Sequence, residues 1–189
     1  MRRWPLVAAA ALVVGLAVLA VVALRRDDPA PPVAASADRL SLPLPATAGG
    51  WQRVEDDATA RMQRAFQQSV DQRVGDVDVA VALYEREDGD RFRVTALVPH
   101  PGGTTSRSLR ADPDSQLRDF LTGAGVQRPG PVDGGTPAVV MMCGRGADPG
   151  PACGWADRWA LALVSYGDPG ITRDQAAAET RRLRADLSH

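Results

Sequence analysis

The chain has 189 residues and a formal net charge of −1 at pH 7, and because it contains no lysine, all 22 of its strongly basic side chains are arginines. This length suits one ordinary domain plus a targeting segment, and the near-neutral charge argues against a nucleic acid as partner. The absence of lysine excludes a P-loop and a Schiff-base lysine, and the absence of asparagine excludes an N-glycosylation site.

The first predicted element is a membrane-spanning helix at residues 6–24. The sequence LVAAAALVVGLAVLAVVAL has no polar side chain, and at about 1.5 Å per residue it is roughly 28 Å long, the thickness of a bilayer core. A cleaved export signal has a shorter apolar region with a small-residue cleavage site close behind it. Here the charged residues 25–28 follow at once, and the one plausible cleavage pattern, at 35–37, lies further on. We expect an uncleaved anchor; a cleaved signal and a buried core helix are the alternatives.

The span divides the chain into segments. Residues 1–5 are expected to form a short cytoplasmic N-terminus, and residues 25–39 a flexible tether rich in proline and alanine. Residues 40–189 are expected to form one extracytoplasmic domain. Arginines flank the span on both sides, so the positive-inside rule alone does not orient it.

The first half of this domain shows clear periodicity. Met62, Phe66 and Val70 recur every four residues and predict a helix from Asp57 to about Gln72. The segments VDVAVALYERE and RFRVTALV then alternate apolar and polar residues, and an acidic turn joins them. This pattern predicts a β-hairpin.

The second half begins with a loop, PGGTTSR at 101–107, which we expect to be solvated and not an anion-binding nest. Asp112 and Pro113 predict the start of a helix that ends near Gly123. A linking stretch rich in glycine and proline precedes the strand AVVMMC, and strand character resumes over 153–166. A capping box, Thr172 with Gln175, starts the last helix, whose predicted inward residues are Ala176, Thr180, Leu183 and Leu187. The order predicts an α+β domain, an antiparallel sheet with about three packed helices.

The only two cysteines, Cys143 and Cys153, allow four interpretations: metal ligands, a redox pair, a disulfide or two free thiols. Structural zinc usually takes four ligands, and the only histidines are His100 and His189, far from the pair in sequence. A redox pair needs Cys-x-x-Cys at the start of a helix. The intervening GRGADPGPA is able to turn back on itself, so we expect a disulfide worth about 2 to 3 kcal/mol, with two free buried thiols as the main alternative.

A disulfide implies an oxidising compartment. It therefore orients the predicted span, with the N-terminus inside and residues 40–189 outside. The conclusion depends on the disulfide.

Beyond Cys153 the alternation predicts that Trp155, Asp157 and Trp159 share one strand face, as a candidate structural or interaction cluster. Asp157 is expected to accept backbone hydrogen bonds or to pair with an arginine; as a catalytic acid it would need a partner that the sequence does not indicate. The Gly-x-Gly in GRGADPG is followed by prolines where a dinucleotide site would start its helix. We predict no catalytic, cofactor-binding or metal-binding residue.

Several features together resemble a group of small membrane-anchored proteins of unknown function from high-GC actinobacteria. They are the single N-terminal span, the Pro/Ala tether, the segment LPATAGGW at 44–51 and the late segment CGWAD at 153–157. The resemblance covers the whole chain and implies a location and a fold, but no activity.

The expected function is that of a non-enzymatic module at the cell envelope, which binds another envelope protein or senses a signal. A domain that binds a small ligand or a lipid is the alternative, and an envelope enzyme is less favoured. No cofactor and no nucleic acid partner is expected, and the membrane contact is assigned to residues 6–24.

Overall fold

The computed structural model describes residues 44–71 and 75–187, which fall within the predicted domain at 40–189. Within these two stretches, none of the helices combines the length and the apolar character that a bilayer span requires. Three predicted segments lie outside the described residues: 1–5, 6–24 and 25–39.

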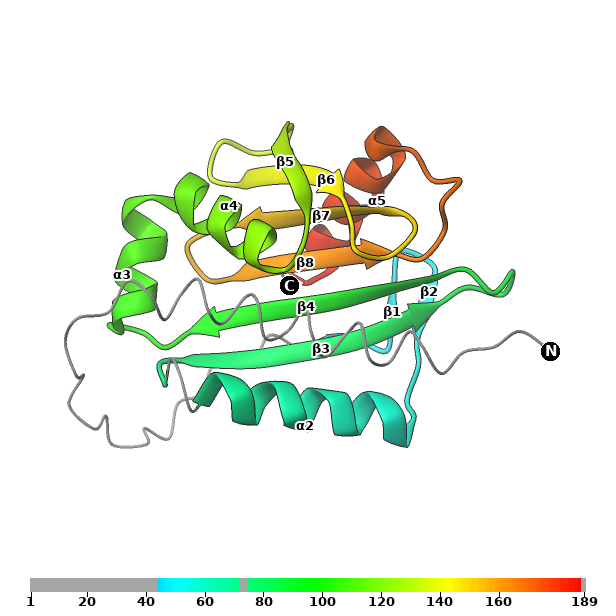
Figure 1. The fold of residues 1–189 in the computed structure, drawn as a ribbon, viewed down its shortest axis with the longest axis horizontal. Coiled ribbons are helices and arrows are strands. Elements are labelled where there is room, and N and C mark those ends of the chain that lie inside the picture. The colour runs from blue at the N-terminus through cyan, green and yellow to red at the C-terminus, as the bar shows by residue number, and fades with distance from the viewer. Residues whose placement is uncertain (1–43, 72–74, 188–189) are drawn as a thin grey trace.

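One antiparallel sheet of eight strands organises the fold, in the order β1-β2-β3-β4-β8-β7-β6-β5 (Figure 1). The strands are β1 (Thr47–Ala48), β2 (Trp51–Arg53), β3 (Val77–Glu85), β4 (Arg91–Pro99), β5 (Gln127–Val132), β6 (Val140–Arg145), β7 (Pro151–Ala156) and β8 (Leu161–Tyr166). The helices are α2 (Asp57–Asp71), α3 (Thr104–Ala111), α4 (Pro113–Gly123) and α5 (Arg173–Leu187). The predicted α+β class is confirmed, with four helices in the described residues where about three were expected.

Several local predictions are confirmed in detail. β3 and β4 pair along their whole length as a hairpin. Asp112 caps α4, because its Oδ1 accepts the N–H of Ser115 at 3.1 Å. At the start of α5, the Thr172 N–H donates to Gln175 Oε1 at 2.8 Å and the Gln175 N–H donates to Thr172 Oγ1 at 3.3 Å, which is the reciprocal pattern of a capping box. The four predicted inward residues of α5 are buried.

The loop expected at 101–107 is partly helical, because α3 begins at Thr104. The residue before it, Gly103, has no side chain with which to cap the helix. Asp76 does so from a distance of 29 residues in sequence: its Oδ2 accepts the Thr105 N–H at 2.9 Å. No local sequence window contains both halves of this cap.

Two strand predictions are also corrected. The linking stretch rich in glycine and proline contains β5, and the single strand expected over 153–166 is divided into β7 and β8. The division occurs at Asp157, whose Oδ1 accepts the N–H groups of Trp159 and Ala160 at 2.9 and 3.1 Å and so closes a turn. Two short strands, β1 and β2, were not predicted.

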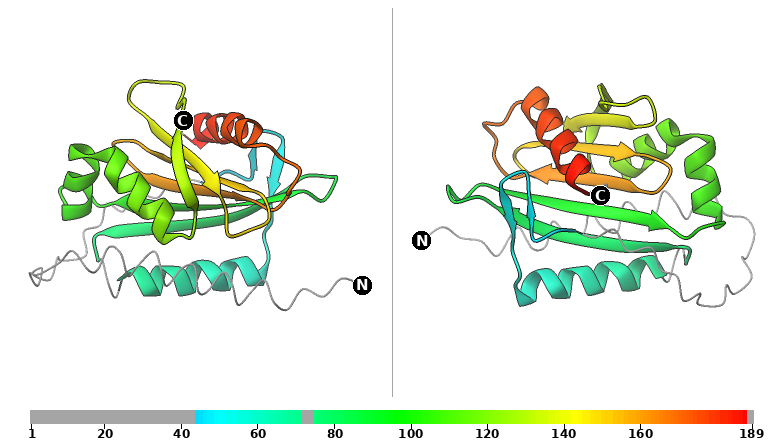
Figure 2. Two further views of the ribbon diagram at one scale, coloured as in Figure 1. Left: turned by 45° about the horizontal axis from the view of Figure 1, so that its top comes forward. Right: turned by 180° about the vertical axis from the view of Figure 1, so that it is seen from behind.

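Each face of the sheet has its own apolar core. One face, here called the three-helix face, packs against α2, α3 and α4; among its buried residues are Val79 of β3, Leu109 of α3 and Leu121 of α4. The opposite face, here called the α5 face, is covered by α5 and by the β1–β2 hairpin (Figure 2). Because successive side chains along a strand point to opposite faces of the sheet, each strand contributes residues to both cores.

An aromatic cluster fills one end of the α5 face. The ring of Phe92 lies 4.7 Å from that of Trp51, 5.1 Å from that of Tyr84 and 5.7 Å from that of Tyr166, measured between ring centres. The Tyr84 hydroxyl donates to the Pro45 carbonyl at 2.9 Å. These contacts fix the β1–β2 hairpin to the sheet.

The cluster predicts a loss of stability at high pH. Burial raises the pKa of Tyr84 to about 12, and burial also raises the pKa of Tyr166. Because a tyrosine in the unfolded chain ionises near pH 10, the stabilisation is complete below about pH 10 and is lost as the pH rises toward 12. Guanidinium unfolding between pH 8 and 11.5 tests this, since Tyr84→Phe should flatten the decline; an equal slope in both proteins would refute it.

Candidate functional site

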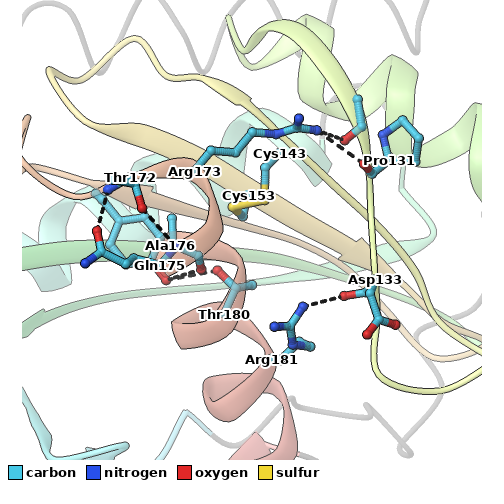
Figure 3. The surroundings of a disulfide bond; sticks show 12 residues. Pro131, Asp133, Cys143, Cys153, Thr172, Arg173, Gln175, Ala176, Thr180 and Arg181 are labelled. Carbon is cyan, nitrogen blue, oxygen red and sulfur yellow. Dashed lines mark hydrogen bonds between the residues drawn. A yellow bond between two sulfur atoms is a disulfide. The ribbon is translucent and has the colours of Figure 1, made fainter.

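Cys143 and Cys153 form the expected disulfide. They lie opposite each other on β6 and β7, with Cα atoms 4.1 Å apart and an S–S bond of 2.06 Å, and both side chains are fully buried in the α5 face (Figure 3). Both cysteines of the sequence are therefore used in a structural cross-link.

Helix α5 holds this part of the sheet through two arginines (Figure 3). Arg173 Nη2 donates to the carbonyl oxygens of Gly130 and Pro131, at 2.8 and 3.3 Å. Arg181 Nη1 donates to the carbonyl of Asp133 at 2.8 Å. The carbonyl groups of Gly130 and Pro131 in β5, and that of Asp133 just after the strand, thus accept hydrogen bonds from side chains of α5.

The structure does not gather the three residues of the predicted cluster on one strand face. Trp155 is 2% exposed and belongs to the core of the α5 face, whereas Trp159 lies in the turn after β7 and is 56% exposed. Asp157 lies between them: in addition to closing the turn, its Oδ2 is 3.4 Å from Nη2 of Arg184 on α5. Its contacts are those of a structural carboxylate.

The described residues contain no group of three or more histidine, cysteine, aspartate or glutamate side chains that is able to hold a metal ion. His100 Nε2 lies 3.3 Å from Asp78 Oδ2, which ties the end of β4 to the start of β3. The hydroxyl of Thr105 donates to Asp76 at 2.6 Å as part of the α3 cap. His189 lies outside the described residues.

A small hollow of about 230 Å³ lies beside the aromatic cluster. The Arg86 guanidinium lies 4.1 Å from the centre of the Trp51 ring and 3.9 Å from Glu179 Oε1 on α5. Arg86 and Glu179, two of the charged residues that line the hollow, therefore pair with each other. This pairing favours a structural role for the hollow.

The two edges of the sheet differ in how well they are protected. β5, at one edge, carries Pro129 and Pro131, which have no N–H to offer, and a bulge at which Arg128 has a φ of 51°. Prolines and bulges are the features by which native sheets prevent another strand from pairing. Together with the arginines of α5, they close this edge.

β3, at the other side, is only partly covered. β2 pairs with its C-terminal end and then leaves the sheet to enter α2 (Figure 1). The Leu83 carbonyl accepts the Val54 N–H at 2.8 Å, and the Val79 N–H donates to Gln67 Oε1 of α2 at 2.7 Å. Odd-numbered residues of β3 therefore turn their peptide groups away from β4. Within the described residues, nothing accepts the N–H of Val81 or donates to its carbonyl.

This open edge faces a groove of about 750 Å³. β3 contributes Ala80, Val81 and Ala82, and the first turns of α2 form the opposite wall with residues such as Ala60 and Gln63. The segment between β2 and α2 closes one end. We call this the β3 groove; it is the candidate functional site.

Sequence reasoning missed the β3 groove. The alternation in VDVAVA predicts the strand, but an alternating pattern does not reveal which strands are neighbours in the sheet. The small side chain of Ala80, between two valines that point to the other face, was the one local signal of space on this side of the strand.

Comparisons of this chain with protein-family models, with curated proteins and with solved structures give no match.

Proposed function

We propose that this chain is a membrane-anchored protein whose domain lies outside the cytoplasm and binds another envelope protein without catalysing a reaction. Residues 6–24, which have no polar side chain, support the anchor. The buried disulfide supports an oxidising location, and hence an N-terminus inside and a domain outside. The resemblance to small actinobacterial membrane proteins remains a prediction.

The observation that carries the binding function is the open edge of β3. An extended segment of a partner is able to add to such an edge as a further strand, with main-chain hydrogen bonds supplying affinity. Native proteins normally protect their edges, and the residues that the structure describes protect β5 but leave Val81 facing a groove. This contrast favours β3 as the docking position.

The alternative, a small ligand or a lipid, accounts for fewer of these features. An apolar ligand would leave the peptide groups of Val81 without partners. It would also lie beside Arg53 and three carboxylates, which line the same groove. A strand satisfies the peptide groups directly.

Photo-crosslinking in cells tests the proposal. A benzophenone side chain introduced at Gln63, which lines the β3 groove, should give a discrete adduct with an envelope protein, whereas the same group at Gln68, exposed on α2 outside the groove lining, should not. The crosslinked peptide of the partner should come from a segment on the outer side of the membrane.

The control is a charge placed on the edge strand. Ala80→Lys should abolish the adduct from position 63, because an edge lysine opposes strand addition while its long side chain reaches solvent through the groove. Ala58→Lys, at an exposed position of α2, should leave the adduct intact. An adduct that survives Ala80→Lys, or a cytoplasmic partner, would reject the proposal.

A further inference from the structure

The chemistry of the partner follows from the β3 groove, and this step rests on the proposed function. The base of the groove on the α5 face is formed by Ala80 and Ala82, and the next residue on that face, Tyr84, is full-sized and buried. Ala60 of α2 lies on the other side of the strand, because α2 packs on the three-helix face, to which Val81 points. Ala82 is buried, at 2% exposure, whereas Ala80 is only partly buried, and its small side chain leaves room beside it for a large apolar side chain.

The peptide groups of Val81 fix where the partner's side chains lie. A strand that pairs with the peptide groups of Val81 places its neighbouring residues beside Ala80 and Ala82, on the α5 face. Successive side chains on one face are two residues apart. A large apolar residue of the partner therefore lies beside Ala80.

The charge of the groove selects a basic partner. Three carboxylates line it, those of Glu55, Asp56 and Asp57, against one guanidinium, that of Arg53, so the lining carries a net charge of −2. Arg53 is already engaged, with the Leu44 carbonyl and with Glu55. The Thr59 N–H donates to Asp56 Oδ1 at 2.7 Å, and hydrogen bonds from Thr59 lower the pKa of Asp56, so that carboxylate is ionised at neutral pH.

We infer that the β3 groove binds an extended segment that places a large apolar residue beside Ala80 and at least one arginine or lysine at the end nearest Glu55 and Asp57. The peptide groups of Val81 give the segment its position, the space beside Ala80 selects the apolar side chain, and the carboxylates select the cation.

Binding of three fluorescent peptides to the full chain in nanodiscs tests this inference. The first alternates leucine with threonine and ends in arginines; the second ends in glutamates instead; the third has alanine in place of leucine. We expect the arginine peptide to bind about fivefold more tightly than the glutamate peptide, as suits solvent-exposed charge pairs. It should also bind at least about tenfold more tightly than the alanine peptide, because each leucine buries apolar surface.

Substitutions in the chain test which residues cause the preference for arginine and which cause the preference for leucine. Glu55→Gln should reduce the preference for arginine, whereas Glu87→Gln, an equal change of charge at an exposed turn position, should not. Ala80→Leu should remove the preference for leucine by filling the hollow.

The outcomes separate the inference from the proposed function. If all three peptides bind equally and Ala80→Lys abolishes their binding, strand addition stands and the inferred partner chemistry is wrong. If none binds at millimolar concentration, the inference also fails, while the crosslinking from position 63 decides the proposed function independently. Preferences that persist in Glu55→Gln and Ala80→Leu would overturn the assignment to these residues.

Discussion

Replacing Trp155 by alanine is expected to lower the free energy of unfolding by about 4 kcal/mol, the largest effect of any change considered. The indole is 2% exposed on β7 and lies in the core of the α5 face, beneath the surface that α5 covers. Its removal forfeits buried apolar area and leaves a cavity that the two sheet neighbours and the helix are too rigid to fill. Guanidinium unfolding of the full chain in detergent, followed by circular dichroism, measures the difference.

Trp159→Ala is the matched control. The same substitution four residues further along removes a ring that is 56% exposed and that contacts the Arg158 guanidinium at 4.7 Å. We expect a loss of less than about 0.5 kcal/mol, because surface substitutions seldom cost more. Equal losses in the two variants would contradict the division of the predicted cluster into a core residue and a surface residue.

Removal of the disulfide is expected to have the second largest effect. Replacing Cys143 and Cys153 together by alanine should cost about 3 kcal/mol, chiefly because the unfolded chain regains the freedom of a loop closed across a sequence separation of 10. The same unfolding experiment with and without reductant should show a reductant effect in the wild-type chain and none in the double variant. A loss below about 1 kcal/mol would refute the expectation.

The redox state of this disulfide also indicates the compartment in which the domain lies. In membranes from cells that make the native chain, alkylation of the two cysteines should require prior reduction, and the unreduced peptides should run as one crosslinked species. Free labelling of both thiols would contradict the oxidising location in the proposed function.

The sequence predicted those elements whose signals are local. The hairpin of β3 and β4, the cap at Asp112 and the box of Thr172 with Gln175 each depend on residues close together in the chain, and all are confirmed. The disulfide was predictable because a turn-forming loop separates the cysteines. In each of these cases the decisive contact lies within a few residues or across one turn.

The errors arise where distant residues decide the structure. α3 has its cap in Asp76, on the far side of the β3–β4 hairpin, and β5 is a strand despite its prolines because β6 pairs with it. The turn at Asp157 could have been predicted from the sequence, because an aspartate that accepts N–H groups two and three residues later is a common turn signal. The β3 groove could not have been predicted from the sequence, because whether a strand lies at the edge of a sheet depends on how all the strands pair.

The pairing of β4 with β8 has a consequence for biosynthesis. This seam runs from Phe92 opposite Tyr166 to Leu97 opposite Leu161, so a ribosome completes β4 long before the strand that covers it. Until then, the emerging polypeptide carries a bare apolar edge on β4 alongside the open one on β3, and such edges promote aggregation. We therefore expect the chain to need a chaperone most when the β3–β4 hairpin has been made and β8 has not.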